Sequence, residues 1–268
     1  MLTNYHTHTT FCDGKNSPEE MVFAAIEKGF KAFGFSGHAY ASYGTDFCMS
    51  KERTEKYIAE IKALKEKYKG KIEIYLGIEE DMFCKADRVR YEYLIGSAHY
   101  VFKDGKYYSL DYNREKTEEA IKAFGGDKLA LAEEYYKTFC EYIVERKPDI
   151  VGHFDIITKF DEIGEPMFSE DKGYQEIALK YLKEAIKSDC IFEVNTGAIS
   201  RGTRKTPYPS LELLHTLKKE NARIILSSDT HSVKTLDCAF RETRELLLDV
   251  GFKEQYALLE GKFQKIKL

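Results

Sequence analysis

The chain begins, at residues 4–14, with the sequence NYHTHTTFCDG. Side chains alternate between the two faces of an extended strand, so His6 and His8 point to one side while Thr7 points to the other. Two neutral imidazoles at the end of a strand form a good pair of ligands for zinc and neighbouring transition metals. Asp13 follows on a turn and adds a carboxylate beside the pair. Taken alone, this stretch fits a metal site and a surface strand equally well, and the remaining histidines decide between them.

Length and composition favour one enzyme-sized domain. An α/β barrel of about 250 residues fits a chain of 268 residues, so a single domain over residues 1–268 is predicted. The net charge is −4, and basic residues are interspersed with acidic ones, which argues against a nucleic-acid or membrane partner. The six cysteines are scattered, and neither a signal peptide nor a membrane-spanning apolar run is found. These features predict a cytoplasmic protein with reduced thiols.

Strand and helix patterns alternate along the chain. Seven apolar strands are predicted over residues 5–9, 32–38, 72–79, 93–99, 149–153, 190–195 and 223–231. Helices are predicted over residues 17–29, after the loop 39–50, and over 115–124, 129–146, 171–188, 210–220 and 235–250. A small hairpin over 101–110, a loop over 196–209 and a tail over 256–268 complete the chain. This order predicts an α/β fold in which parallel strands form a barrel.

Potential metal ligands lie at or just past the ends of six of these strands. They are His6, His8, His38, Glu79, His99, His153, Asp229 and His231. The C-terminal ends of the strands of a parallel barrel converge on one mouth, where active sites are built. Together with Asp13 the set has nine members, too many for one tetrahedral zinc, so two or three divalent ions (Zn, Mn or Fe) are predicted. His215 lies mid-helix and is left out.

The ordered set of motifs resembles the PHP (polymerase and histidinol phosphatase) superfamily. The matching residues are His6-x-His8, Asp13, Ser-Gly-His38, Gly-Ile-Glu79, Ser-Ala-His99, Gly-His153 and Ser-Asp-Thr-His231. Within that superfamily, the single-domain length and residues 193–197 (EVNTG) before Arg201 are most similar to the stand-alone histidinol-phosphate phosphatases. The resemblance implies a distorted seven-stranded β/α barrel with a trinuclear metal cluster. It also implies hydrolysis of histidinol phosphate, in histidine biosynthesis, by a metal-bridging hydroxide.

The same resemblance implies how the ligands divide among three metals. One metal is surrounded by His6, His8, Glu79 and Asp229. Glu79 bridges to a second metal, which is also held by His99 and His153. The third is held by Asp13, His38 and His231.

The chemistry of such a cluster favours a phosphate monoester as the substrate. Adjacent divalent ions lower the pKa of a shared water and clamp the oxygens of an in-line displacement. The other phosphoryl oxygens need a cation, and Arg201, on the loop after the sixth strand, offers two parallel donors. Asp229, His231 and Arg201 are therefore the predicted catalytic residues, and Lys159 is a second candidate for binding phosphate.

Several positions stay open at this point. Arg204 and Lys205 share the Arg201 loop and are expected to be solvated. Glu80 and Asp81 follow Glu79, where they could meet a substrate ammonium group or cap the next segment. The leaving group's proton donor is unassigned, and a metal-bound water could serve.

Three alternative functions share parts of this pattern. A different PHP phosphoesterase, acting on nucleotides, nucleic-acid ends or phosphotyrosine, would use the same ligands, although the net charge of −4 argues mildly against nucleic acid. An amidohydrolase-type barrel also begins with His-x-His, but it typically carries a bridging lysine where this chain has Glu79. A metal-binding protein without catalysis would need a closed ligand shell.

Overall fold

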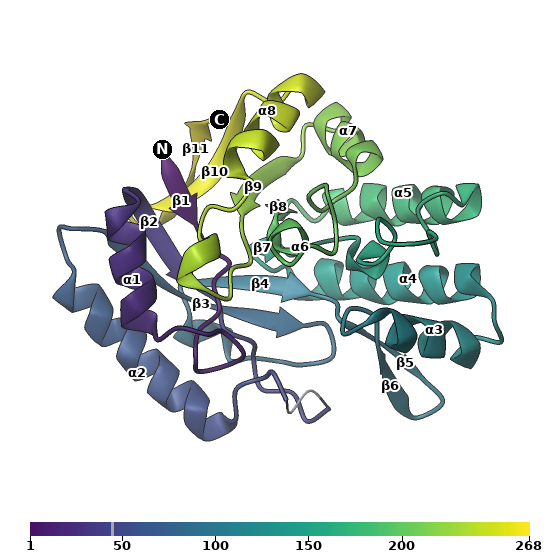
Figure 1. Cartoon of the computed structure of the whole chain (residues 1–268), viewed down its shortest axis with the longest axis horizontal. Coiled ribbons are helices and arrows are strands. Elements are labelled where there is room, and N and C mark those ends of the chain that lie inside the picture. The colour runs from purple at the N-terminus through teal and green to yellow at the C-terminus, as the bar shows by residue number, and fades with distance from the viewer. Residues whose placement is uncertain (44–45) are drawn as a thin grey trace.

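The computed structural model describes residues 1–43 and 46–268, so Gly44 and Thr45, inside the predicted loop 39–50, lie outside the described residues. Seven parallel strands form one sheet in the order β1-β2-β3-β4-β7-β8-β9, which curves into a nearly closed barrel (Figure 1). The strands are β1 (Leu2–Asn4), β2 (Phe30–Phe35), β3 (Glu73–Asp81), β4 (Tyr93–Ser97), β7 (Ile150–Val151), β8 (Ile191–Asn195) and β9 (Arg223–Ser227). The predicted distorted seven-stranded α/β barrel is confirmed.

The barrel closes between the first and last strands, and there the predicted bounds of the first strand were wrong. Regular pairing with β2 ends at Asn4, and residues 5–9 continue as an extended segment. An isolated parallel bridge joins Thr7 to Thr230, where His8 N donates to Thr230 O at 2.8 Å and Thr230 N donates to His6 O at 3.1 Å. The two histidines of the opening motif therefore lie at the seam of the barrel.

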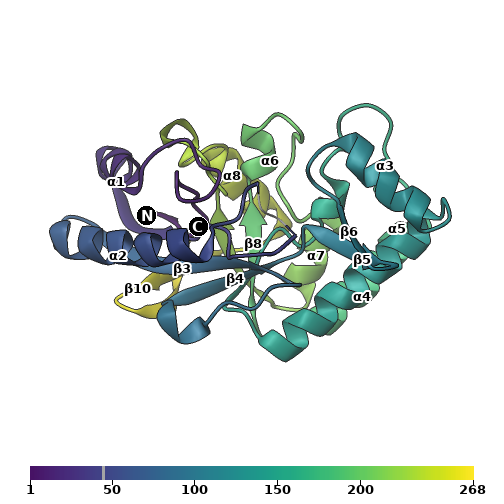
Figure 2. The same ribbon diagram turned by 90° about the horizontal axis from the view of Figure 1, so that it is seen from below.

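Helices cover the outside of the sheet near their predicted positions (Figures 1 and 2), except that the helix predicted over 235–250 begins only at Phe240, after a 3-10 turn and a loop. They are α1 (Pro18–Glu27), α2 (Lys51–Lys67), α3 (Arg114–Ala123), α4 (Lys128–Arg146), α5 (Lys172–Ile186), α7 (Leu211–Lys219) and α8 (Phe240–Val250). The capping box that predicted the start of α1 is present, since Ser17 and Glu20 exchange hydrogen bonds. A short helix, α6 (Gly197–Ser200), lies in the predicted loop after β8, and a 3-10 turn, η2 (Ile156–Thr158), follows β7. Among the described residues, no helix is long and apolar enough to cross a membrane.

Two antiparallel hairpins stand outside the barrel sheet. The predicted hairpin is formed by β5 (Tyr100–Lys103) and β6 (Lys106–Ser109), and Asp104 and Gly105 adopt positive φ at its turn. The second hairpin, β10 (Glu254–Leu259) and β11 (Lys262–Lys267), was not predicted in the tail. Leu258 and its neighbours pack with apolar side chains of the barrel interior, and Tyr5 Oη donates to Leu258 O at 2.7 Å. This hairpin closes the barrel at the N-terminal ends of its strands, so the opposite end carries the mouth.

Candidate metal centre

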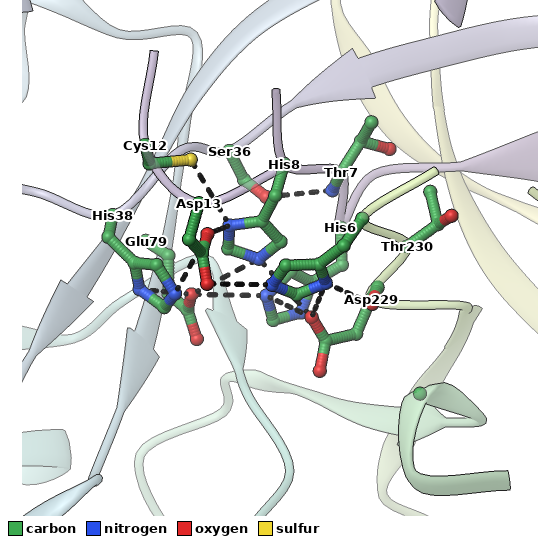
Figure 3. A network of polar contacts seen from close by, with 12 residues as sticks. His6, Thr7, His8, Cys12, Asp13, Ser36, His38, Glu79, Asp229 and Thr230 are labelled. Atoms are coloured by element: carbon green, nitrogen blue, oxygen red, sulfur yellow. Dashed lines mark hydrogen bonds and ion pairs between the residues drawn. The ribbon is translucent and has the colours of Figure 1, made fainter. Parts of the chain in front are cut away.

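His6 and His8 occupy the extended segment that follows β1, and both side chains point into the barrel mouth (Figure 3). Both are fully buried, and their ring centroids lie 5.2 Å apart. Thr7, between them, points away from the cluster, and its hydroxyl accepts a hydrogen bond from Asn4 Nδ2 at 3.3 Å (Figure 3). The alternation expected of an extended segment thus places the imidazole pair on one side.

Glu79, on β3, lies between two sets of histidines and turns one carboxylate oxygen to each. Its Oε2 lies 3.2 Å from His6 Nε2 and 2.9 Å from His38 Nδ1. Its Oε1 lies 3.1 Å from His153 Nε2 and 3.4 Å from His99 Nε2. Burial by itself would raise the pKa of Glu79, but the surrounding imidazoles, first that of His6, hold this pKa well below its usual range. The carboxylate is ionised, and each of its two oxygens faces a different set of histidines.

Asp229 follows β9 and also presents its two oxygens to different partners. Oδ1 lies 3.2 Å from His8 Nε2, whereas Oδ2 accepts a hydrogen bond from Arg201 Nη2 at 2.8 Å. Burial would raise the pKa of Asp229, but Arg201 and then His6 hold it well below the usual range. The residue has a φ of 47°, a left-handed conformation that aspartate tolerates better than most residues. Asp229 therefore connects the histidine cluster to the predicted phosphate-binding arginine.

Asp13 lies close to three histidines at the mouth, His8, His38 and His231. Its Oδ2 lies 3.2 Å from His231 Nε2, and its Oδ1 lies 3.6 Å from His8 Nδ1 and 3.8 Å from His38 Nε2. The His8 and His231 rings stack with centroids 4.1 Å apart. Asp13 follows the opening motif by a few residues, so a local turn brings its carboxylate back to the strand-end imidazoles.

The nine predicted ligands all belong to groups whose ligand atoms lie within 4.8 Å of one another. These groups are His8, Asp13, His38 and His231; His6, His8 and Glu79; His6, His153 and Asp229; and His38, Glu79 and His99. Within residues 1–43 and 46–268, buried His6 Nε2, His8 Nε2 and Glu79 Oε2 have close polar neighbours, but none of these contacts has hydrogen-bond geometry. Buried polar atoms are normally paired, and imidazole with carboxylate suits Zn, Mn or Fe. The residues fit a cluster of divalent metal ions, while the division of ligands among individual ions stays a prediction.

Glu193, on β8, orients two of these histidines, a role for which the sequence analysis had no assignment. Its Oε1 lies 2.7 Å from His6 Nδ1, and its Oε2 accepts from His153 N at 2.9 Å and Asn195 Nδ2 at 2.8 Å. When His6 Nδ1 carries the proton and donates a hydrogen bond to this carboxylate, Nε2 is unprotonated. Its lone pair then points into the cluster. A glutamate inside the apolar strand IFEVN (residues 191–195) is itself unusual, so the sequence alone could have indicated a role for Glu193.

The structure also distinguishes the two carboxylates that follow Glu79. Glu80 is held by Arg146, with Nε and Nη2 bonds of 2.7 and 2.8 Å, so it is structural. Asp81 Oδ2 accepts from His99 N at 2.8 Å and lies 3.2 Å from His99 Nδ1, while Oδ1 accepts from Tyr43 Oη at 2.6 Å. Asp81 thus positions His99 much as Glu193 positions His6.

The predicted phosphate-binding cations lie at the mouth and already contact carboxylates. Besides Asp229 Oδ2, Arg201 donates from Nη1 to Asp229 O at 3.1 Å, and its side chain is 30% exposed. Lys159 Nζ donates to Asp111 O at 2.6 Å and lies 3.3 Å from Asp111 Oδ2. Both side chains line the same cavity as the metal ligands, so the structure leaves both available to a ligand there.

The expectation that Arg204 is solvated was wrong. Its side chain is buried, its guanidinium packs 4.6 Å from the ring centroid of Tyr208, and it pairs with Glu162 at 3.2 Å. The loop folds back on η2, where Arg204 Nη1 donates to Thr158. Arg204 is therefore buried although it lies on a polar loop. Lys205 is exposed as expected, and His215, which was left out of the ligand set, is exposed on α7.

A cavity of about 430 Å³ opens over the cluster. Its inner wall includes Glu79, Asp229 and Arg201. The rest of its lining comes from the loop before α2, the β5–β6 hairpin, the segment after that hairpin and the end of η2, with Phe47, Tyr100, Ser109, Asp111, Tyr112 and Lys159. The volume suits a small-molecule ligand that reaches the metal ligands with one end.

The chain is similar to known proteins over most of its length. The PHP domain family matches residues 4–197. A probable histidinol-phosphatase of Schizosaccharomyces pombe is 27% identical over 86% of this chain and 81% of its own length. The histidinol-phosphatase of Bacillus subtilis is 26% identical over 88% of this chain and 95% of its own length. The crystal structure of histidinol phosphate phosphatase from Lactococcus lactis, complexed with zinc, L-histidinol and phosphate, has the same fold, with a TM-score of 0.72, 21% identity and 98% of both chains covered.

Proposed function

This chain belongs to the PHP domain family, and we propose that it is a metal-dependent phosphomonoesterase that hydrolyses L-histidinol phosphate to L-histidinol and phosphate. The observation that carries the proposal is the convergence of nine imidazole and carboxylate ligands on one mouth beneath a small-molecule cavity. The curated relatives support the substrate, since two of them that span most of this chain are histidinol-phosphatases by name.

The nine clustered residues would hold two or three divalent metal ions, zinc being the ion in the Lactococcus lactis protein. Bound there, such ions supply charge neutralisation of the phosphoryl oxygens and a water of lowered pKa. Glu79 is the proposed bridging ligand, because each of its oxygens faces a different set of histidines. Glu193 and Asp81 hold His6 and His99 by their Nδ1 atoms and so fix which ring nitrogen faces inward.

Arg201 is the proposed phosphate-binding residue of the chain. Its guanidinium lines the cavity beside Asp229, where a non-bridging phosphoryl oxygen can meet its exposed donors. Asp229 keeps the guanidinium in place through Oδ2, so the donor is preorganised before substrate arrives. Lys159 lines the same cavity as a second cation, with one of its three ammonium hydrogens left for phosphate after its two contacts with Asp111.

The cavity favours a catalytic role over metal storage, because Glu79, His99 and Asp229 line it and a substrate can approach them there. We also propose that residues 1–268 form one domain, since β10 completes the interior of the barrel that β1 begins. A cytoplasmic location fits the six free cysteines.

The test is phosphate release from a panel of monoesters after metal analysis of the purified protein. Histidinol phosphate should exceed nucleotides by a large factor in kcat/KM. Faster turnover of nucleotides or oligonucleotide ends would replace the proposed substrate while leaving the phosphoesterase in place.

A further inference from the structure

The loop after β8 presents Arg201 to the cavity and buries Arg204 only three positions later. Resting on the proposed function, we propose that Arg204 is a positioning residue for phosphate binding. It forms a latch with Thr158 and Glu162, and this latch holds the turn that carries Arg201 against η2. The structure thereby assigns the placement of the phosphate-binding guanidinium to three residues that do not line the cavity.

The guanidinium of Arg204 joins its own loop to the segment that follows β7. Its Nη1 donates to the hydroxyl of Thr158 and, at 3.4 Å, to the backbone oxygen of the same residue. Its Nη2 lies 3.2 Å from Glu162 Oε1 and donates to Thr206 Oγ1 at 3.1 Å. A planar guanidinium holds its donors in fixed directions, so one side chain can fasten η2 and the residues after it at the same time.

Glu162 closes the latch from the other side. Its Oε2 accepts a hydrogen bond from the backbone N–H of Lys205, and its Oε1 accepts one from Thr206 Oγ1. Further along the loop, Ser210 N donates to Asp155 Oδ2 at 2.9 Å, directly before η2. The loop is therefore attached to the segment around η2 at successive points, and Arg204 and Glu162 make the attachment that lies nearest to Arg201.

A compact turn connects the latch to Arg201. The backbone N–H of Arg204 donates to Ala198 O at 3.3 Å, and that of Arg201 donates to Gly197 O at 3.1 Å. Arg201 and Arg204 thus belong to one hydrogen-bonded turn, so a shift at Arg204 moves the backbone that carries Arg201. On the other side of the latch, η2 leads directly into Lys159, which lines the cavity. The latch therefore fixes the turn relative to the cavity wall.

The burial of Arg204 is costly, which indicates that the position of this turn matters. A buried charge needs a partner, and Glu162 supplies one while the Tyr208 ring lies 4.6 Å from the guanidinium carbon. Even so, Arg204 Nε is buried without a hydrogen-bond partner in the described part of the chain. Lys205, the next residue, remains exposed, so burial is specific to the side chain that forms the latch.

The test is a double-mutant cycle on the metal-loaded protein, with histidinol phosphate and p-nitrophenyl phosphate as substrates. Glu162→Gln removes one acceptor oxygen of the latch at a side chain that is 24% exposed, so the variant should fold. The kcat/KM should fall by about 10-fold or more for both esters, because misplacing a binding group by about 1 Å can cost about 100-fold. In an Arg201→Ala background, the same change should cost about twofold or less, since the group that the latch positions is gone.

Arg204→Lys is the second variant, because it keeps the charge and loses the fixed fork of donors. It should show the same loss with Arg201 present and the same lack of effect in the Arg201→Ala background. If Arg204→Lys fails to fold, Glu162→Gln alone decides the question. Glu165→Gln is the matched control, since it makes the same change at an exposed position of the same segment and should leave both backgrounds unchanged.

Equal losses from Glu162→Gln with and without Arg201 would overturn the proposal, because a merely structural defect lowers both backgrounds alike. Wild-type kinetics in Glu162→Gln and in Arg204→Lys would overturn it as well.

Failure of the proposed function reads differently. If the metal-loaded protein hydrolyses no monoester, the phosphatase proposal is wrong, and calorimetric binding of inorganic phosphate to the four proteins of the cycle still decides the latch. A dissociation constant that Glu162→Gln raises by about 5-fold or more only when Arg201 is present supports it. An equal effect in both backgrounds, no effect in either, or no binding of phosphate to the wild-type protein overturns it.

Discussion

The two ends of the barrel are built from the same strands and differ in what those strands carry. At the mouth, buried carboxylates and imidazoles surround Glu79, whereas at the other end Tyr5, Tyr75 and Leu258 pack beneath the C-terminal hairpin. Strand β3 shows the contrast within one element. Tyr75 lies in the apolar interior, whereas Glu79, further along the same strand, lies in the cluster. The comparison indicates that one end contributes chemistry and the other stability, the usual division in such barrels.

Metal removal should show the largest difference between the two ends, because it should abolish activity at the mouth and leave the fold intact. Elemental analysis should find two or three transition-metal ions per chain, and chelation should abolish phosphatase activity because the cluster supplies the neutralising charge. The chain should stay folded, since the interior beneath the hairpin does not depend on metal. Full activity in a protein with one ion or none would contradict the multinuclear site.

Arg201→Ala should produce the next largest loss. Removing one preorganised donor typically costs on the order of 10²–10³ in rate, so kcat/KM should fall by that factor while metal content at saturating metal persists. Arg201→Lys should recover only part, because an ammonium keeps the charge without the paired donors. Lys205→Ala, exposed on the same loop, is the control, because buried Arg204 would disturb folding. Wild-type kinetics in Arg201→Ala would remove the residue from phosphate binding.

Glu193→Gln should act through the metals. The change weakens the acceptor at His6 Nδ1, and loss of such a partner typically lowers metal affinity by about 10- to 100-fold. Competition with a chelator, followed by the metal content of the recovered protein, measures this without an activity assay. Activity should return as the metal concentration is raised. Unchanged affinity would restrict Glu193 to a structural role.

Leu258→Ala should spare the mouth almost entirely. Truncating this buried leucine should lower the free energy of unfolding by about 2–5 kcal/mol, as measured by denaturant unfolding. The kcat/KM of the folded, metal-loaded variant should stay within about twofold of wild type, because the metal ligands lie at the opposite end of the strands. A larger kinetic defect would show that the two ends are coupled.

Much of this architecture could be predicted because it is local. The seven strands and the capping box of α1 follow from periodicity and end signals, and most of the predicted ligands are polar residues at or just past the ends of apolar strands. The bounds of β1 were missed because the segment after it does not continue the pairing with β2, and Thr7 instead forms an isolated bridge with Thr230, more than two hundred positions away. The C-terminal hairpin was missed because β10 packs against a surface that only the whole barrel creates.

The sequence by itself determined the fold class, the family and the set of metal-binding candidates, because strand-end position is a local property and parallel strands share one mouth. Only the tertiary structure decided which oxygen of Glu79 faces which histidine, and that Glu193 and Asp81 hold His6 and His99. It also decided that Arg204 is buried while Arg201 reaches the cavity, although the two lie three positions apart on one loop. Side-chain partners depend on distances between segments that meet only after folding, and spacing along the chain carries no record of those distances.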